Sequence, residues 1–225
     1  SGSLKLTNTT VVKPVYFGEK IDYEIQVENP GALPYQADTE ECWILKDVLS
    51  PYAYIEPEGM EKMFEADESK TMGIIITGAE LEEWEEQQGL YEGRIFWKNG
   101  SNSGENLMET AVDQLMIGWN NTGTGIQVKV GDQIYEEASI AAALQKAGFA
   151  PGRWTQYTIT WNLNEADSLF QLNAGEIRRF QVYARAKDTF QMLSEDWQTS
   201  YPTDASLALT NAASIVTATG QQKAI

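Results

Sequence analysis

The alternation of apolar and polar residues over 20–29 constrains the fold of this chain more than any other feature. Every second residue is apolar, and the residues between them are charged or carry an amide: Ile21, Tyr23, Ile25 and Val27 alternate with Lys20, Asp22, Glu24, Gln26 and Glu28. A period of two is that of a β-strand with one buried face and one face in water. The same period recurs over 154–163, 180–186 and 207–215. The sequence therefore predicts a mainly β protein.

Turn-forming residues separate these strands. Clusters that contain Asn, Pro or Gly occur at 29–31, 99–100, 120–123 and 174–175. Short strands separated in this way favour an Ig-like antiparallel β-sandwich. A chain of 225 residues can bury a core without a metal or a disulfide. We expect one sandwich domain over 1–218 and a linker-like tail at 219–225.

The middle of the chain departs from the strand pattern. A capping-box spacing predicts one short helix over about 78–88. Apolar residues at helical spacing predict a second helix that begins after Ser139 and ends at Gly148. We interpret residues 56–152 as an insertion or an elaborated sheet edge within the sandwich.

The charge and composition of the chain limit its function. It has 33 acidic and 16 basic residues and a formal net charge of −17, and a surface of that sign repels nucleic-acid phosphates and anionic lipid headgroups. No apolar run approaches the roughly 20 residues of a membrane span. The chain has no histidine, the commonest general base near neutral pH, and its acidic clusters lack the ordered spacing of a calcium loop. We expect no cofactor, no metal, no membrane insertion and no enzyme activity beyond self-modification.

Three stretches follow the pattern of a known family. Residues 18–29 read Gly-Glu-Lys-Ile-Asp-Tyr-Glu-Ile-Gln-Val-Glu-Asn, and residues 45–51 read Leu-Lys-Asp-Val-Leu-Ser-Pro. The third combines Leu-Asn-Ala-Gly-Glu at 172–176 with Leu-Thr-Asn-Ala-Ala at 209–213. In this order they resemble the conserved repeat domain of bacterial surface proteins and the isopeptide-forming pilin and collagen-adhesin-like domains of Gram-positive bacteria. The matches cover about the first 50 and the last 70 residues.

The resemblance implies a structural or adhesive module of a cell-wall-anchored surface protein or pilus, located outside the cell. The implied partners are neighbouring domains of the same chain and a host or community surface ligand, either protein or glycan. Residues 1–3 lack the charged and apolar regions of a signal peptide, so we expect the export signal and any wall anchor to lie in a longer parent chain. The single cysteine, Cys42, excludes an internal disulfide.

The resemblance also implies a covalent bond between a lysine and an asparagine. It assigns Lys5 as the nucleophile, Asn211 as the amide and Asp47 as the promoting acid. The reaction needs a neutral lysine and a protonated acid, and burial favours both because desolvation lowers a lysine pKa and raises an aspartate pKa. Asn211 and Asp47 are each in phase with the apolar residues of their strands. Both side chains are therefore predicted to face the core.

The nucleophile is less well defined by the pattern. Leu4 and Leu6 flank Lys5, so simple alternation puts the lysine on the solvent face. Lys13, which lies in an apolar stretch, is the fallback nucleophile. The alternative is that the buried acid and amide only hydrogen-bond to backbone groups inside the core.

Other functions remain open. Cys42 and Gln156 resemble the Cys and Gln elements of surface-adhesin thioester domains, although a buried free cysteine and a strand glutamine explain both residues. The aromatic residues could form a carbohydrate-binding platform. Trp43 and Trp161 follow the buried phase, which leaves four others to test for exposure: Trp84, Trp97, Trp119 and Trp197. A glycoside hydrolase would need two convergent carboxylates in an exposed cleft.

Overall fold

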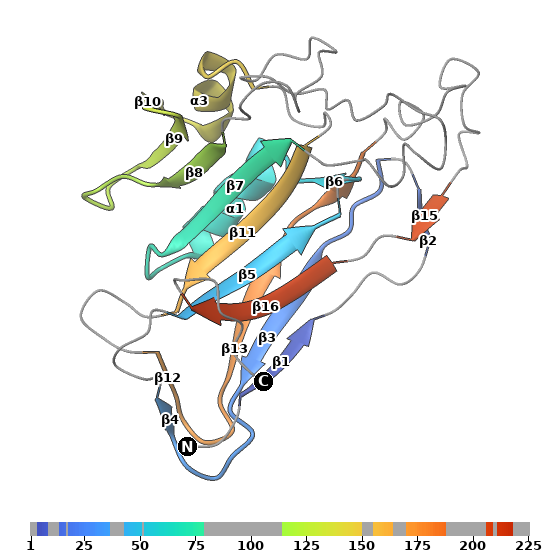
Figure 1. The fold of residues 1–225 in the computed structure, drawn as a ribbon, viewed down its shortest axis with the longest axis vertical. Helices are drawn as coiled ribbons and strands as arrows, with labels where there is room; N and C mark the ends of the chain where they lie inside the picture. The colour runs from blue at the N-terminus through green and yellow to red at the C-terminus, as the bar shows by residue number, and fades with distance from the viewer. Residues whose placement is uncertain are drawn as a thin grey trace.

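The computed structural model describes residues 4–8, 14–16, 18–36, 43–50, 52–78, 114–149, 155–163, 170–187, 206–208 and 211–217. Within these ranges the chain is mainly β, with several antiparallel sheets in an arrangement compatible with a β-sandwich (Figure 1). The predicted fold class is confirmed at this level. Residues 79–88 of the first predicted helix and the tail at 219–225 lie outside the described residues.

The largest sheet has seven antiparallel strands in the order β10-β9-β8-β7-β11-β5-β16. The strands are β5 (Trp43–Leu49), β7 (Met72–Gly78), β8 (Leu115–Trp119), β9 (Ile126–Val130), β10 (Gln133–Glu136), β11 (Thr155–Asn162) and β16 (Asn211–Thr217). The first and last segments of the chain that enter this sheet, β5 and β16, pair with each other, and β8, β9 and β10 extend it beyond β7.

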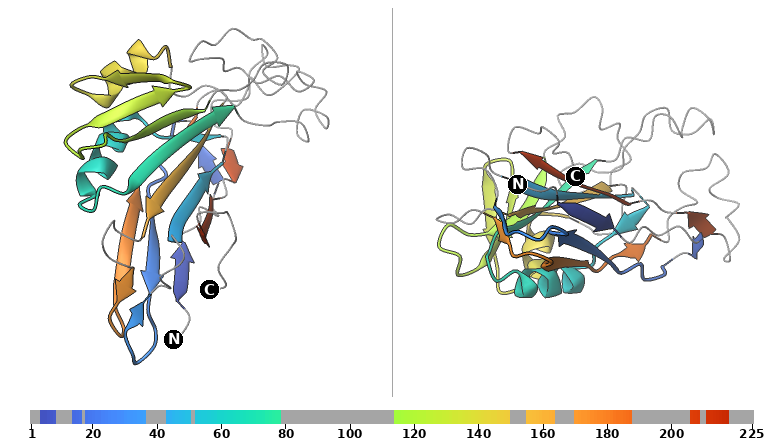
Figure 2. Two further views of the ribbon diagram at one scale, coloured as in Figure 1. Left: turned by 60° about the vertical axis from the view of Figure 1, so that its left-hand side comes forward. Right: turned by 90° about the horizontal axis from the view of Figure 1, so that it is seen from below.

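A three-stranded sheet lies behind the seven-stranded one in the view of Figure 1. Its order is β1-β3-β13, with β1 (Lys5–Asn8), β3 (Tyr23–Glu28) and β13 (Ile177–Val182). Three further strand pairs join β2 (Pro14–Tyr16) to β15 (Ser206–Ala208), β4 (Tyr35–Gln36) to β12 (Gln171–Leu172), and β6 (Ala53–Tyr54) to β14 (Arg185–Ala186). Figure 2 shows both larger sheets edge-on and from below.

The period of two predicted the strands and their buried faces. In β3 and β11, buried and half-buried residues alternate along the whole strand, as expected for 20–29 and 154–163. The pattern over 180–186 is divided between β13 and β14. The period of two identifies a strand because successive side chains point to opposite faces of the sheet, one packed on the core and the other facing water.

The helices were predicted less well than the strands. Helix α3 (Ile140–Lys146) begins where expected: the Ser139 hydroxyl accepts a hydrogen bond from the backbone N–H of Ala142 at 3.1 Å. Gly148 follows it with a φ of 79°, a left-handed conformation that favours glycine. Helix α1 (Pro57–Ala66) was missed, although it has a proline in its first turn and buries Met60, Met63 and Phe64 at helical spacing.

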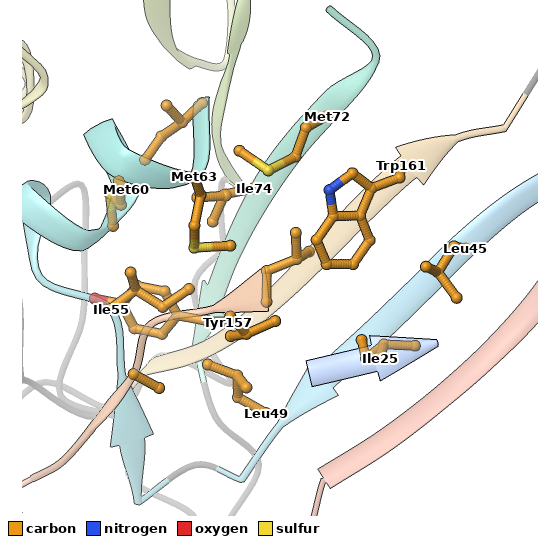
Figure 3. Packing of buried hydrophobic residues seen from close by; sticks show 14 of the residues in the cluster. Ile25, Leu45, Leu49, Ile55, Met60, Met63, Met72, Ile74, Tyr157 and Trp161 are labelled. Atoms are coloured by element: carbon orange, nitrogen blue, oxygen red, sulfur yellow. The ribbon is translucent and has the colours of Figure 1, made fainter. Parts of the chain in front are cut away.

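The core lies between the two larger sheets and under α1. Figure 3 shows Met60 and Met63 of α1 beside Ile74 of β7, with Leu45 of β5 and Ile25 of β3 further along. These side chains are at most 3 % exposed. Burial of each contributes roughly 1.5–3 kcal/mol, so the packing of α1 against the sheets is a substantial part of the stability.

Asn29 holds the turn after β3 against the turn before β13. Its side chain is buried and its Nδ2 group donates to the carbonyl oxygens of Leu33 (2.8 Å), Leu172 (3.2 Å) and Asn173 (3.1 Å). Its Oδ1 accepts from the backbone N–H of Gly31 at 3.1 Å. The two hydrogens of Nδ2 are shared among three carbonyl oxygens, so one amide links four backbone groups from two distant loops.

We expect Asn29→Ala to lower the free energy of unfolding by about 2–3 kcal/mol, because buried backbone groups lose their partner. Asn173→Ala is the matched control: that side chain is exposed and, among the described residues, its Nδ2 group donates to Glu176 at 3.4 Å, so a change below about 0.5 kcal/mol is expected. Urea denaturation of both variants measures the difference. Equal stability of the two variants would contradict the role of Asn29.

Candidate functional site

Asp47 is the centre of the candidate site. Strand β5 buries every second residue, and Asp47 falls on the buried face with no exposed surface. Its Oδ2 accepts a hydrogen bond from the hydroxyl of Tyr23, on β3 of the facing sheet, at 2.9 Å. Its Oδ1 makes no hydrogen bond of ordinary geometry within the described residues. The acid therefore lies in the interior between two sheets, as predicted from its phase.

Asn211 reaches the same place from the C-terminal part of the chain. Strand β16 pairs with β5 so that Asn211 lies opposite Leu49 and Ala213 lies opposite Asp47. The Asn211 Oδ1 is 2.9 Å from the hydroxyl of Tyr23. We refer to these residues as the Asp47–Tyr23–Asn211 cluster. It joins three strands through one phenol.

The cluster needs more than one hydrogen to satisfy its contacts. The Tyr23 hydroxyl has a single hydrogen but lies at hydrogen-bonding distance from an oxygen of Asp47 and an oxygen of Asn211. One way to supply the second hydrogen is a protonated Asp47 that donates to Tyr23, in which case the hydroxyl hydrogen goes to Asn211 instead of Asp47. The alternative is a rotated Asn211 amide whose Nδ2 group donates to Tyr23.

Burial favours the protonated form of Asp47. It raises the pKa of Asp47 from 3.8 to about 6, and this effect outweighs the hydrogen bonds from Tyr23 and Asn211, which lower the pKa. Burial and the neighbouring Asp47 also raise the pKa of Tyr23 above its ordinary value of 10.0. The cluster therefore holds a neutral phenol and a carboxyl group that is protonated near pH 6.

The predicted lysine nucleophiles do not join this cluster in the described structure. Lys5 lies on β1 opposite Glu28, and its side chain is exposed while Leu4 is buried and Leu6 half-buried. Lys13 lies outside the described residues. The structure brings the acid and the amide together, and the assignment of the nucleophile stays a prediction.

The thioester pair is described only in part. Cys42 lies outside the described residues. Gln156, on β11, donates from its Nε2 to the carbonyl oxygen of Leu49 at 3.0 Å. This side chain therefore has the role of a strand glutamine that caps a backbone carbonyl.

A buried lysine was missed by the sequence pattern. Lys187 follows β14 and is fully buried, and its Nζ donates to the carbonyl oxygen of Thr155 at 2.8 Å. Burial lowers the pKa of Lys187 well below its ordinary value. Because Ala186 is also buried, strict alternation would have put Lys187 in solvent, so the period of two could not reveal it.

The three described tryptophans, Trp43, Trp119 and Trp161, do not form an exposed aromatic surface for binding a carbohydrate. Trp43 and Trp161 are buried, as their phase predicted. Trp119 is half-buried: its Nε1 donates to Asp67 at 2.9 Å and its ring packs edge-on against Phe64. The other three, Trp84, Trp97 and Trp197, lie outside the described residues.

The described residues also bear on metal binding and on membrane insertion. In these ranges no group of three or more His, Cys, Asp or Glu side chains is placed to hold a metal ion. None of the helices there has the length and apolarity to cross a membrane. No protein-family model matches the chain, and no curated protein sequence matches it.

The raised pKa of Asp47 predicts how stability depends on pH. Because the folded protein holds this proton more tightly than the unfolded chain, the stabilisation is present near pH 4 and is lost as the pH rises through about 6. Relative to Asp47→Asn, which does not titrate, the free energy of unfolding of the wild type should fall by about 2 kcal/mol between pH 4 and pH 7. Chemical denaturation across this range measures it. A constant difference between the two proteins would show that Asp47 is not perturbed.

Lys187 predicts the opposite dependence. The unfolded chain takes up a proton on Lys187 that the folded protein excludes, so this residue lowers stability at neutral pH. Lys187→Met should therefore raise the free energy of unfolding at pH 7, and the gain should shrink as the pH approaches 10. Lys46→Met, at an exposed position of β5, is the control that should show no such trend. A gain that grows with pH would contradict the prediction.

Proposed function

We propose that the chain is a non-enzymatic structural or adhesive module of a bacterial cell-wall-anchored surface protein or pilus. The proposal takes the sandwich to be Ig-like and residues 56–152 to be an insertion that extends one sheet through β8, β9 and β10. It is supported by the resemblance of 18–29 and 45–51 to surface-protein repeat domains, since these two segments form the neighbourhood of Tyr23 and Asp47. In this role the module carries load along a chain of domains or displays a binding surface.

The observation that carries the proposal is the contact of Asp47 and Asn211 through Tyr23 inside the core. Asp47 is buried and Asn211 is half-buried, and polar groups away from water lower stability unless they are paired or used in chemistry. Asp47 is on β5 and Asn211 is on β16. These two strands are neighbours in one sheet although they are far apart in sequence. A covalent bond at Asn211 would tie the last described strand to an earlier part of the chain.

We propose that the bond is an amide between a lysine and Asn211. The neutral amine of the lysine attacks the Asn211 carbonyl carbon, the new nitrogen–carbon bond forms, and the bond to Nδ2 breaks. Asp47 in its protonated form polarises the amide oxygen and transfers protons so that Nδ2 leaves as ammonia. Tyr23 lies 2.9 Å from both partners and orients them.

The lysine that attacks is the open part of this proposal. Lys5 is on the solvent face of β1, with an exposed side chain. Lys13 lies between β1 and β2 in the sequence. Its apolar surroundings in the sequence favour the neutral amine that the reaction needs, so Lys13 is the fallback nucleophile behind Lys5, the residue that the resemblance assigns.

Bond formation expels one ammonia, so the intact mass of the folded protein should be lower than the sequence mass by that amount. Asn211→Ala and Asp47→Ala should each restore the full mass expected for the variant, since one removes the electrophile and the other the acid. Asn173→Ala, at an exposed position, is the control that should keep the deficit. Intact-protein mass spectrometry reads all of these. A full sequence mass for the wild type would exclude the bond.

The same measurement identifies the nucleophile. A deficit that vanishes in Lys13→Ala and persists in Lys5→Ala assigns Lys13, and the reverse assigns Lys5. A deficit that depends on Cys42 and Gln156 would instead indicate a thioester, which also releases ammonia. Methylamine separates the two products, because it cleaves a thioester and leaves an amide intact.

A further inference from the structure

A groove runs beside β13, at the edge of the three-stranded sheet. It has about 330 Å³ of free space, within the range of ligand-binding clefts. One wall is β13, and the other is formed by the end of α1, the turn after it and the first residues of β7. The groove lies on the opposite edge of the three-stranded sheet from β1, and the residues of the Asp47–Tyr23–Asn211 cluster do not line it.

The edge of β13 that faces the groove has unpaired main-chain groups. Its partner on the other side is β3, and the Ala184 carbonyl accepts from the N–H of Ile21 at 3.1 Å. Main-chain groups alternate in direction along an antiparallel strand, so those of Arg179 and Gln181 point away from β3. Both residues line the groove, and within the described residues no backbone hydrogen bond outside the strand pairs involves them.

Helix α1 covers only one end of this edge. A Cβ atom on Gly59 would lie 3.1 Å from the carbonyl oxygen of Tyr183, so the helix and the strand touch there and glycine permits the approach. Further along β13 the two separate, and the gap opens between Met63 of α1 and Phe180. The edge is therefore closed at Tyr183 and open at Arg179 and Gln181.

The floor of the groove is apolar with one unused donor. Phe180 and Trp161 pack at 5.2 Å between ring centroids, and Met63 and Met72 line the space beside them. Trp161 is only 5 % exposed, yet its indole N–H donates to none of the described residues. Figure 3 shows this nitrogen turned towards Met72. An apolar side chain that entered the groove would meet both the aromatic floor and this donor.

Positive charge marks the outer side of the same strand. Arg179 is exposed and its Nε is 3.3 Å from Glu24, in a chain whose formal net charge is −17. Across the groove, the Asp67 carboxylate is already used by Met72 N, Trp119 Nε1 and Ser69 Oγ. An acidic residue placed beside β13 on its outer face would therefore meet an arginine.

We propose that the β13 edge binds an extended peptide as an added β-strand. The main chain of the peptide pairs with Arg179 and Gln181, its apolar residues enter the groove over Trp161 and Phe180, and an acidic residue between them lies beside Arg179. This is strand addition, in which main-chain hydrogen bonds supply affinity and pockets for alternate side chains supply specificity. The open edge spans four residues, Arg178 to Gln181, and an added strand also rises by about 3.3 Å per residue, so the edge fits about four residues of a peptide. The inference does not depend on the covalent bond proposed above.

The test uses a dye-labelled peptide with blocked ends and alternating valine and glutamate, titrated with the whole chain by fluorescence anisotropy. Gln181→Pro removes the outward N–H without removing a bond to β3, whereas Gln181→Ala keeps it. We expect saturable binding by the wild type, and at least tenfold weaker binding by Gln181→Pro than by Gln181→Ala. Equal binding by the two variants, or no binding by the wild type, would overturn the proposal.

A second measurement keeps the test decisive if Gln181→Pro is unstable, which a thermal melt would reveal. The same peptide, N-methylated at the alternate amides that face the strand edge, cannot pair in this way and should bind the wild-type protein at least tenfold more weakly. A peptide with lysine in place of glutamate should also bind more weakly, and the difference should shrink with added salt. If N-methylation has no effect, the ligand does not bind as a strand. If lysine binds as well as glutamate, the assigned charge preference is wrong.

Discussion

The contact of one phenol with one carboxyl group across the core sets the arrangement of the two larger sheets. Tyr23 of β3 and Asp47 of β5 meet at 2.9 Å, and Asn211 of β16 meets the same hydroxyl. A one-residue slip of any of these strands would turn its polar side chain to the other face of its sheet and leave the partners buried without hydrogen bonds. The cluster therefore specifies register as well as linking the sheets, in a core that is mostly apolar.

Among the described residues, Asp47 and Lys187 are buried in this core, and both are disposed towards their neutral forms. Burial raises the pKa of Asp47 and lowers that of Lys187, in agreement with the high free energy of an unpaired charge away from water. Asp47 has partners on two other strands, while Lys187 donates to the backbone carbonyl of Thr155 at the start of β11. Natural sequences keep such groups where they specify structure or perform chemistry, and the proposed amide bond gives Asp47 the second role.

The proposed bond site and the proposed peptide site lie at different parts of the three-stranded sheet. The cluster is reached through the inner face of β3, whereas the groove lies along the free edge of β13. Tyr23 and Val182 are paired neighbours across these strands, so the strand that contacts Asp47 and Asn211 in the core is also the strand that pairs with β13.

The sequence by itself determined which residues are buried along each strand. A period of two is a local property of the chain, and it predicted the inward direction of Asp47 as well as the solvent position of Lys5. The sequence also predicted α3 from its N-terminal cap residue, a signal that lies within one turn of the helix, but α1 was missed. What only the tertiary structure decided was which groups meet. Tyr23 was predicted simply as a core residue, and its partners lie 24 and 188 positions away in the chain. The burial of Lys187 and the groove beside β13 likewise depend on segments that are distant in sequence, and no local periodicity encodes the approach of such segments.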